Sequence, residues 1–318
     1  MREILSARVD VSLARALALA LCLSALIQPA VGDDATGAPA GVSRAMDLYA
    51  RALRCAKGDG VPQDYSQAAE YMRQAAEAGY ALAQNDLGVY YAKGLGVKQD
   101  YAEAAKWYRK AADQGDPLAE YSLGRICLEG RGVPTNVVES LAWYKKAADQ
   151  NQPDALLALG YLYFEGHEGI RADWREALHW FQKAVAAGRA GALNSIGFMY
   201  EHGGTGVDQD LSQALNSYRD AANRNDAEGQ MNLGRLYYEG LGVKTDYAEA
   251  YKWFYLAHSN GSGIANHYLQ ELEGSALMHP ALLTPDQISK ATQAAQEIQR
   301  KKLRDTPSQT LVKERMRD

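Results

Sequence analysis

Apolar residues in this chain recur at helical spacing in pairs of neighbouring segments. In the clearest pair, Ala83, Leu87 and Tyr91 fall at positions i, i+4 and i+8, which places them on one face of a helix. Apolar residues return at helical spacing over residues 104–111. The sequence between the two segments, Gly94-Leu95-Gly96-Val97, is too rich in glycine to continue a helix. The pattern predicts two helices joined by a tight turn.

The same helix–turn–helix pattern occurs six times, at intervals of 36 or 37 residues. Each copy has a glycine in the turn and an Asp or Asn four residues later. These pairs are Gly60/Asp64, Gly96/Asp100, Gly132/Asn136, Gly169/Asp173, Gly206/Asp210 and Gly242/Asp246. A fixed period of this length indicates a stacked array, in which each unit buries its apolar face against its neighbours. We therefore expect an all-α repeat fold.

Residues at both ends of the second segment mark the limits of its helix. The Asp or Asn can accept a hydrogen bond from an amide of the first turn, and a Glu or Gln three residues later predicts a capping box. A Gly or Asn ends every copy, and these residues adopt the left-handed conformation at low cost. The capping pairs end in Gln67, Glu103, Glu139, Glu176, Gln213 and Glu249, and the terminal residues are Gly79, Gly115, Asn151, Gly188, Asn225 and Gly261.

Five copies also carry a glycine inside the first predicted helix. These are Gly88, Gly124, Gly160, Gly197 and Gly234. A glycine within a helix costs roughly 1 kcal/mol relative to alanine, so the shared register predicts close approach of another helix. We interpret the bulky residues of the second helix, Trp107, Trp143, Trp180 and Trp253, as the side chains that pack there. Tyr71 and Ser217 replace Trp in the first and fifth copies.

These motifs resemble the Sel1-like repeat, a relative of the tetratricopeptide repeat. The family pattern A-x-A-x-x-x-L-G-x-x-Y-x-x-G-x-G-V-x-x-D-x-x-x-A-x-x-W-Y-x-x-A-A-x-x-G is matched nearly completely by residues 81–115 and closely by residues 233–261. The first copy departs from it at Arg51 and Ala52, and the fourth and fifth turns contain one extra residue. The resemblance implies a right-handed α-solenoid whose concave side binds proteins or peptides.

The N-terminal residues have the pattern of a secretory signal. Arg2, Arg8 and Arg15 precede the apolar run 16–27, which is too short to span a membrane comfortably, and Ala30-Val31-Gly32 supplies small residues before a cleavage site. We expect a signal peptide over residues 1–32, a linker over 33–43, and a periplasmic or secreted protein. An uncleaved signal that anchors the protein in the inner membrane is the alternative.

The array itself is assigned to residues 44–262, and the residues after it predict a cap. Ala265, Leu269 and Leu272 have the spacing of a seventh first helix. Thr284-Pro285-Asp286-Gln287 combines an N-cap, a proline at the first helical position and a glutamine that completes a capping box. We expect capping helices over residues 263–304 and a basic, disordered tail over 305–318.

Composition limits the classes of function. A net charge of −5 and a pI near 5.8 argue against a nucleic-acid-binding protein. Cys55 and Cys127 are two repeat periods apart, which places them about 20 Å from each other because packed helices are 8–10 Å apart. A disulfide needs Cα atoms within about 7 Å, so we expect two free thiols.

Motifs for catalysis or metal binding are absent from the sequence. None of the six histidines forms an H-x-x-x-H or H-E-x-x-H pair, and the chain contains no G-x-S-x-G, P-loop or C-x-x-C motif. We expect neither catalytic residues nor a metal or other cofactor. The protein is therefore predicted to be non-enzymatic.

A partner-binding surface is expected on the concave face, where the first helix of each unit faces inward. Positions that the repeat does not reserve for the core carry polar, aromatic and thioether side chains, and Tyr and Arg are enriched at binding hot spots. The predicted residues are Asn85, Val89, Tyr121, Arg125, Leu157, Tyr161, Asn194, Phe198, Met231 and Arg235. For each of the aromatic residues, packing between repeats is the alternative role.

Together these features predict a monomeric, exported scaffold that binds a protein or peptide and regulates an envelope process. Membrane contact is expected at most through an uncleaved signal or the basic tail. Two alternatives stay open. Some secreted Sel1-like proteins have been linked to β-lactam binding, although those carry a cysteine pair in every repeat and this chain does not. Exposed aromatic residues could instead stack on the sugars of cell-wall glycans.

Overall fold

The computed structural model describes residues 40–274 and 281–305. The chain divides into two compact units, residues 1–43 and 44–318, and only residues 40–43 of the first are described. The predicted signal peptide lies outside the described residues, as does the predicted tail from residue 306 onward. The predicted linker overlaps the first described helix, which begins at Ala40. None of the described helices combines the length and hydrophobicity needed to cross a bilayer.

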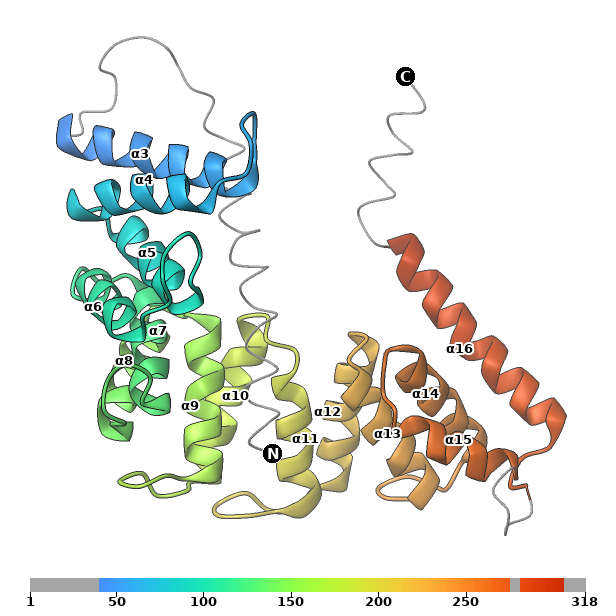
Figure 1. Ribbon diagram of the computed structural model, residues 1–318. Helices are drawn as coiled ribbons and strands as arrows, with labels where there is room; N and C mark the ends of the chain where they lie inside the picture. The colour runs from blue at the N-terminus through green and yellow to red at the C-terminus, as the bar shows by residue number, and fades with distance from the viewer. Residues whose placement is uncertain (1–39, 275–280, 306–318) are drawn as a thin grey trace. The chain divides into compact units, whose positions relative to one another are not determined.

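Fourteen helices and no strands are present in the described ranges, which confirms the predicted all-α repeat fold. The first helices of the six repeats are α3 (Ala40–Lys57), α5 (Ala81–Lys93), α7 (Pro117–Glu129), α9 (Pro153–Glu165), α11 (Ala192–His202) and α13 (Ala227–Glu239). The second helices are α4 (Tyr65–Glu77), α6 (Tyr101–Ala112), α8 (Val137–Asp149), α10 (Trp174–Ala186), α12 (Leu211–Asn223) and α14 (Tyr247–Ser259). Two further helices, α15 (Ala265–Glu273) and α16 (Pro285–Asp305), follow them (Figure 1).

The predicted ends of the second helices are confirmed, with one correction to the capping box. The Asp100 carboxylate accepts hydrogen bonds from the amides of Ala102 at 2.9 Å and Glu103 at 3.0 Å. The amide of Asp100 is not bonded to the Glu103 side chain, because it donates to the carbonyl of Tyr91 in the first helix at 2.9 Å. The same backbone bond occurs in all six repeats. The cap residue therefore ties the two helices of a repeat together.

The glycines inside the first helices pack against aromatic rings, as the sequence predicts, but the rings are not those of the tryptophans. A Cβ added to Gly124 would lie 2.7 Å from the Tyr144 ring, and one added to Gly234 would lie 2.8 Å from the Phe254 ring. In each repeat the ring belongs to the residue after the Trp position. The five rings are Tyr108, Tyr144, Phe181, Tyr218 and Phe254. The helix rotates by about 100° per residue, so a shift of one position changes the side chain that faces the glycine.

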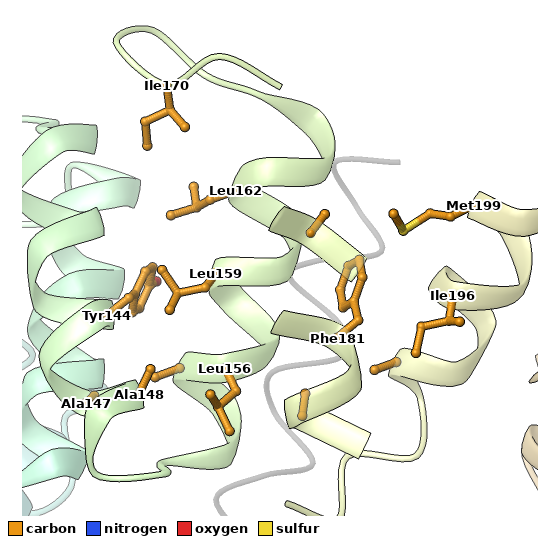
Figure 2. Packing of buried hydrophobic residues seen from close by; sticks show 14 of the residues in the cluster. Tyr144, Ala147, Ala148, Leu156, Leu159, Leu162, Ile170, Phe181, Ile196 and Met199 are labelled. Carbon is orange, nitrogen blue, oxygen red and sulfur yellow. The ribbon is translucent and has the colours of Figure 1, made fainter. Parts of the chain in front are cut away.

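Apolar contacts between repeats form the core. Figure 2 shows Tyr144 of α8 beside Leu159 of α9, while Phe181 of α10 faces Ile196 and Met199 of α11. These side chains are buried, and the contact continues from one helix pair to the next. Each repeat thus buries its second helix against the first helix of the following repeat.

The turns divide into two kinds. In a regular turn the motif glycine touches the preceding repeat, since a Cβ on Gly96 would lie 2.0 Å from the carbonyl oxygen of Tyr65. The fourth and fifth turns have one extra residue and contain isolated β-bridges, between His167 and Ile170 and between Gly204 and Val207. In these two turns the motif glycines lie further from the preceding repeat, since a Cβ on Gly169 would be 3.2 Å from Val138 Cγ2 and one on Gly206 would be 3.4 Å from Arg175 Cβ.

The C-terminal helices close the array. Ala291 and Ala295 of α16 are buried with residues of α14, so α16 packs against α14. Near its end, Lys302 Nζ donates to the carbonyl of Ala222 at 3.3 Å, at the end of α12. Cys55 and Cys127 are free and buried, which confirms the prediction of two unpaired thiols.

Candidate partner-binding site

The ten predicted binding residues lie on α5, α7, α9, α11 and α13, two on each first helix, and we call this surface the first-helix face. Phe198 is 40% exposed. Seven others are partly buried: Val89, Tyr121, Arg125, Leu157, Tyr161, Met231 and Arg235. Asn85 and Asn194 are buried, although the sequence predicts that they face a partner. Asn194 Nδ2 donates to the Asp226 carboxylate at 2.7 Å, so this amide contributes to packing between α11 and α13.

A carboxyl group that sequence reasoning missed lies beside Asn85. Asp86 Oδ2 accepts a hydrogen bond from the Tyr49 hydroxyl at 2.8 Å, and its other oxygen accepts one from Asn85 Nδ2 at 3.1 Å. No cation of the described residues forms an ion pair with it. Burial raises the pKa of Asp86 to about 6, although these two hydrogen bonds act in the opposite direction. Tyr49 is far from Asp86 in sequence, and only the stacking of α3 on α5 brings them together.

Arg235 is fully paired within the protein. Its Nη2 atom contacts both oxygens of Glu201 at 2.6 Å, and its Nη1 atom contacts Glu239 Oε2 at 3.0 Å. The buried Glu201 carboxylate also accepts a hydrogen bond from the Tyr218 hydroxyl at 2.9 Å. Burial, together with the neighbouring Glu201, raises the pKa of Tyr218, which therefore stays protonated. Arg235, Glu201 and Tyr218 form a closed polar network across the fifth and sixth repeats.

Arg125 occupies a comparable position on α7 without such partners. Its guanidinium makes no hydrogen bond or ion pair with the rest of the described chain, and its Nε atom is buried and unpaired. Burial disfavours the charged form of Arg125. The nearby Tyr121 and Glu129 outweigh this effect, so the pKa of Arg125 lies above its ordinary value. Arg125 is therefore a charged, partly buried group on the first-helix face with no ion pair in the described chain.

Aromatic side chains gather around Phe198, and we call Phe164, Trp174, Phe198 and His202 the aromatic patch. Trp174 stacks on Phe164 with ring centroids 5.0 Å apart, and Phe198 contacts both rings at 5.9 and 6.2 Å. The exposed His202 ring stacks on Phe198 at 4.1 Å. The patch lies where the lengthened fifth turn begins, and a Cβ on Gly204 would collide with the Trp174 ring at 2.3 Å.

Only one residue of the aromatic patch was predicted from the sequence. Phe198 belongs to the predicted stripe, whereas Phe164, Trp174 and His202 do not. Tyr161, another predicted residue, packs edge-on against the buried Phe181 at 5.1 Å and so belongs partly to the core. In the described ranges, no group of three or more His, Cys, Asp or Glu residues is placed to hold a metal ion.

The arrangement is that of a stacked helical-repeat scaffold. Six segments match the Sel1 repeat family, residues 42–80, 81–116, 117–152, 153–188, 190–226 and 227–262. The chain belongs to the Sel1 repeat family. Sel1 repeats generally mediate protein–protein interactions, and the family generally consists of non-enzymatic repeat scaffolds.

Two solved structures are similar to this chain over most of its length. One is c5321, a protective antigen present in uropathogenic Escherichia coli strains, with 34% identity over 80% of this chain and a TM-score of 0.69. The chain spans about half of that protein, 53% of its length. The other is a Sel1 repeat protein from Oxalobacter formigenes, with 30% identity, a TM-score of 0.63, and coverage of 81% of this chain and 97% of that one. The comparison with curated proteins gave no match.

Proposed function

We propose that this protein is an exported, non-enzymatic adaptor that binds a protein or peptide through its first-helix face. Its family generally mediates protein–protein interactions, which supports this class of function. The proposal goes further in assigning the surface and the compartment. It describes a monomer in the periplasm or outside the cell, where it regulates an envelope process by holding a partner in place.

The aromatic patch is the observation that carries the proposal. Large aromatic side chains contribute strongly to protein interfaces because each buries much area with few rotatable bonds. Phe198 is 40% exposed, although the neighbouring rings of Phe164 and Trp174 hold it in position. A rigid and exposed aromatic group is a suitable anchor for a partner, because little conformational entropy is lost on binding.

Export is supported by the N-terminal sequence alone. Arg2, Arg8 and Arg15 precede an apolar run, and small residues follow it. Sequencing the N-terminus of the protein recovered from fractionated cells tests this part. A start near Asp33 in the periplasmic or extracellular fraction is expected, whereas an intact N-terminus in the cytoplasmic fraction would contradict export.

Site-specific photocrosslinking tests the binding surface. A photoreactive phenylalanine at position 198 should crosslink one protein in living cells, and affinity capture with the unmodified chain should enrich the same protein. Phe198→Ala should reduce that enrichment at least about tenfold, as expected for an aromatic hot spot.

Val138 provides the matched control, because it is an apolar residue that is 61% exposed on the second helix α8. Val138→Ala should leave enrichment unchanged, and circular dichroism should show both variants folded. Equal recovery by the wild type and Phe198→Ala would contradict the assigned surface.

A further inference from the structure

The repeat register allows a direct comparison between two pairs of repeats. Arg125 and Arg235 both follow the glycine inside a first helix, Gly124 and Gly234, by one residue. Burial raises the pKa of a tyrosine on the second helix of the preceding repeat, and each arginine lies near enough to act in the opposite direction, Arg125 on Tyr108 and Arg235 on Tyr218. The two tyrosines also share a register, since they face the equivalent glycines Gly88 and Gly197. The same arginine–tyrosine pair is therefore built twice.

The first difference between the two sites is a carboxylate in the preceding repeat. Glu201, whose carboxylate joins Arg235 to Tyr218, lies four residues after Gly197. The residue four positions after Gly88 is Ala92, which has no polar side-chain atom. The repeat that precedes Arg125 thus supplies no carboxylate at the position where the other site has one.

A second difference removes the remaining internal partner of Arg125. On α13, Glu239 lies four residues after Arg235 and contacts its Nη1 atom at 3.0 Å. On α7, Glu129 has the same spacing from Arg125, but its carboxylate pairs with Arg131 Nε at 2.9 Å. Arg125 is left with neither of the two carboxylates that neutralise Arg235.

We propose that Arg125 is a binding site for a carboxylate supplied by a peptide partner, in the role that Glu201 plays for Arg235. This inference rests on the proposed adaptor function, because it names the chemistry of the partner. The ligand is a glutamate or aspartate side chain of a bound peptide. Tyr121 lies four residues before Arg125 on α7, and therefore on the same face of that helix.

The charge of the site favours such a ligand. The Arg125 guanidinium is partly buried and makes no ion pair in the described chain, and a carboxylate can pair with a guanidinium in two strong hydrogen bonds. The protein uses this geometry at Arg235, where both oxygens of Glu201 contact one guanidinium nitrogen. Arg125 is partly exposed, so a ligand can reach it from solvent.

Side-chain NMR of arginine Nε–H groups in the purified full chain tests the proposal. The probe is the peptide N-acetyl-Gly-Ser-Glu-Ser-Gly-amide, compared with its Gln counterpart and with inorganic phosphate. The Arg125 resonance, assigned through its loss in Arg125→Lys, should shift saturably with the glutamate peptide only. Arg235 is the internal control and should not respond, because its carboxylate is already present.

Two substitutions at position 92 make the test specific. Ala92→Glu places a carboxylate where Glu201 lies in the other pair of repeats, and it should weaken peptide binding at least about tenfold, since the internal carboxylate competes for Arg125. Ala92→Gln introduces a side chain of the same size without the charge and should retain binding. Circular dichroism checks that both variants fold.

Three results would overturn the proposal: no shift of Arg125 with the glutamate peptide, tighter binding of phosphate than of the peptide, or equal binding by Ala92→Glu and Ala92→Gln. These results are separate from those that test the adaptor function. If Arg125 binds the peptide but crosslinking at position 198 identifies no protein, the carboxylate site stands and the adaptor function fails. If crosslinking succeeds and Arg125 does not respond, only the assignment of the carboxylate fails.

Discussion

The second and third repeats differ from the fifth and sixth in how they treat the same charged position. Arg235 is neutralised by Glu201 and Glu239, whereas Arg125 has no ion pair in the described chain. The cap-amide bonds and the glycine–ring contacts around the two arginines are the same, although the turn of the fifth repeat is one residue longer than that of the second. The repeat therefore determines the scaffold, while carboxylates at two variable positions, one in the preceding repeat and one on the same helix, determine whether the arginine is paired.

The second and third repeats also hold the converse group, a carboxyl without a cation. Asp86 is bonded to Tyr49 and Asn85 and has a raised pKa. The second and third repeats therefore contain a carboxyl and a guanidinium that each lack an ion pair in the described chain, while the fifth and sixth contain a closed network. Unpaired buried charges cost stability, so unfolding measurements on variants of both regions test this difference.

The largest effect is expected for Glu201→Ala. The substitution leaves Arg235 with one partner and the Tyr218 hydroxyl with no acceptor, so the free energy of unfolding should fall by about 3 kcal/mol. Urea unfolding followed by circular dichroism measures the change. The double variant Glu201→Ala/Arg235→Met, which removes both charges, should recover most of the loss. A loss below about 1 kcal/mol for the single variant would show that the ion pair with Glu201 contributes little, so that Arg235 is no better stabilised than Arg125.

A smaller, pH-dependent effect is expected for Asp86→Asn. The pKa of Asp86 is raised from 3.8 to about 6 in the folded protein, so its protonated form is favoured by folding. The associated stability is fully present below pH 3.8 and is lost as the pH rises through 6. At pH 7.5 the variant should be more stable than the wild type by about 2 kcal/mol, and at pH 3.5 the two should be alike.

Urea unfolding at the two pH values measures this difference. Asp59→Asn changes an exposed carboxyl in the first turn and serves as the control, with no expected difference at either pH. A stabilisation by Asp86→Asn that is the same at both pH values would show that the ionised carboxyl is not the cause.

The smallest change in stability is expected for the glycine–ring contacts, which the two regions share. Gly124→Ala and Gly234→Ala each place a methyl group against a ring, Tyr144 or Phe254, at 2.7 and 2.8 Å. Overpacking costs about 1–3 kcal/mol, and the gain in helix propensity offsets about 1 kcal/mol of it. Each variant should lower stability by about 1 kcal/mol, and thermal unfolding should give similar values for both. A clear difference between them would mean that the two scaffolds are not equivalent.

Much of the fold could be predicted from the sequence because the same helix, turn and capping signals occur in six copies. The caps at Asp100 and its equivalents and the left-handed residues at Gly115 and its equivalents are local features, and the structure has them where the pattern places them. Trp107, Trp143 and Trp253 are buried as core side chains, as predicted, but the ring that faces each glycine belongs to the next residue. The pattern identifies bulky positions but not which of two adjacent rings faces the glycine. That distinction depends on the rotation of one helix relative to the other.

The site was less predictable because it depends on contacts between repeats. Arg235 was on the predicted stripe, but its partner Glu201 is 34 residues away and belongs to the previous repeat. Arg235 follows its helix glycine by one residue, whereas Glu201 follows the equivalent glycine of the preceding repeat by four. This offset of three residues arises from the way neighbouring first helices stack, which the sequence of one repeat does not show. Once this offset is known, the sequence shows that the second repeat has Ala92 at the position where the fifth has Glu201.

The bond from each cap amide back to the first helix has a consequence for how such a chain can change in length. Because Asp100 and its equivalents close a repeat using only groups within that repeat, a duplicated stretch of DNA encoding one period carries its own connectors. An inserted copy would extend the array without new joining sequences, and it would move Arg125 and Arg235 apart by one whole unit. The spacing between such arginine positions can thus evolve in discrete steps, while single substitutions decide whether each arginine is paired internally.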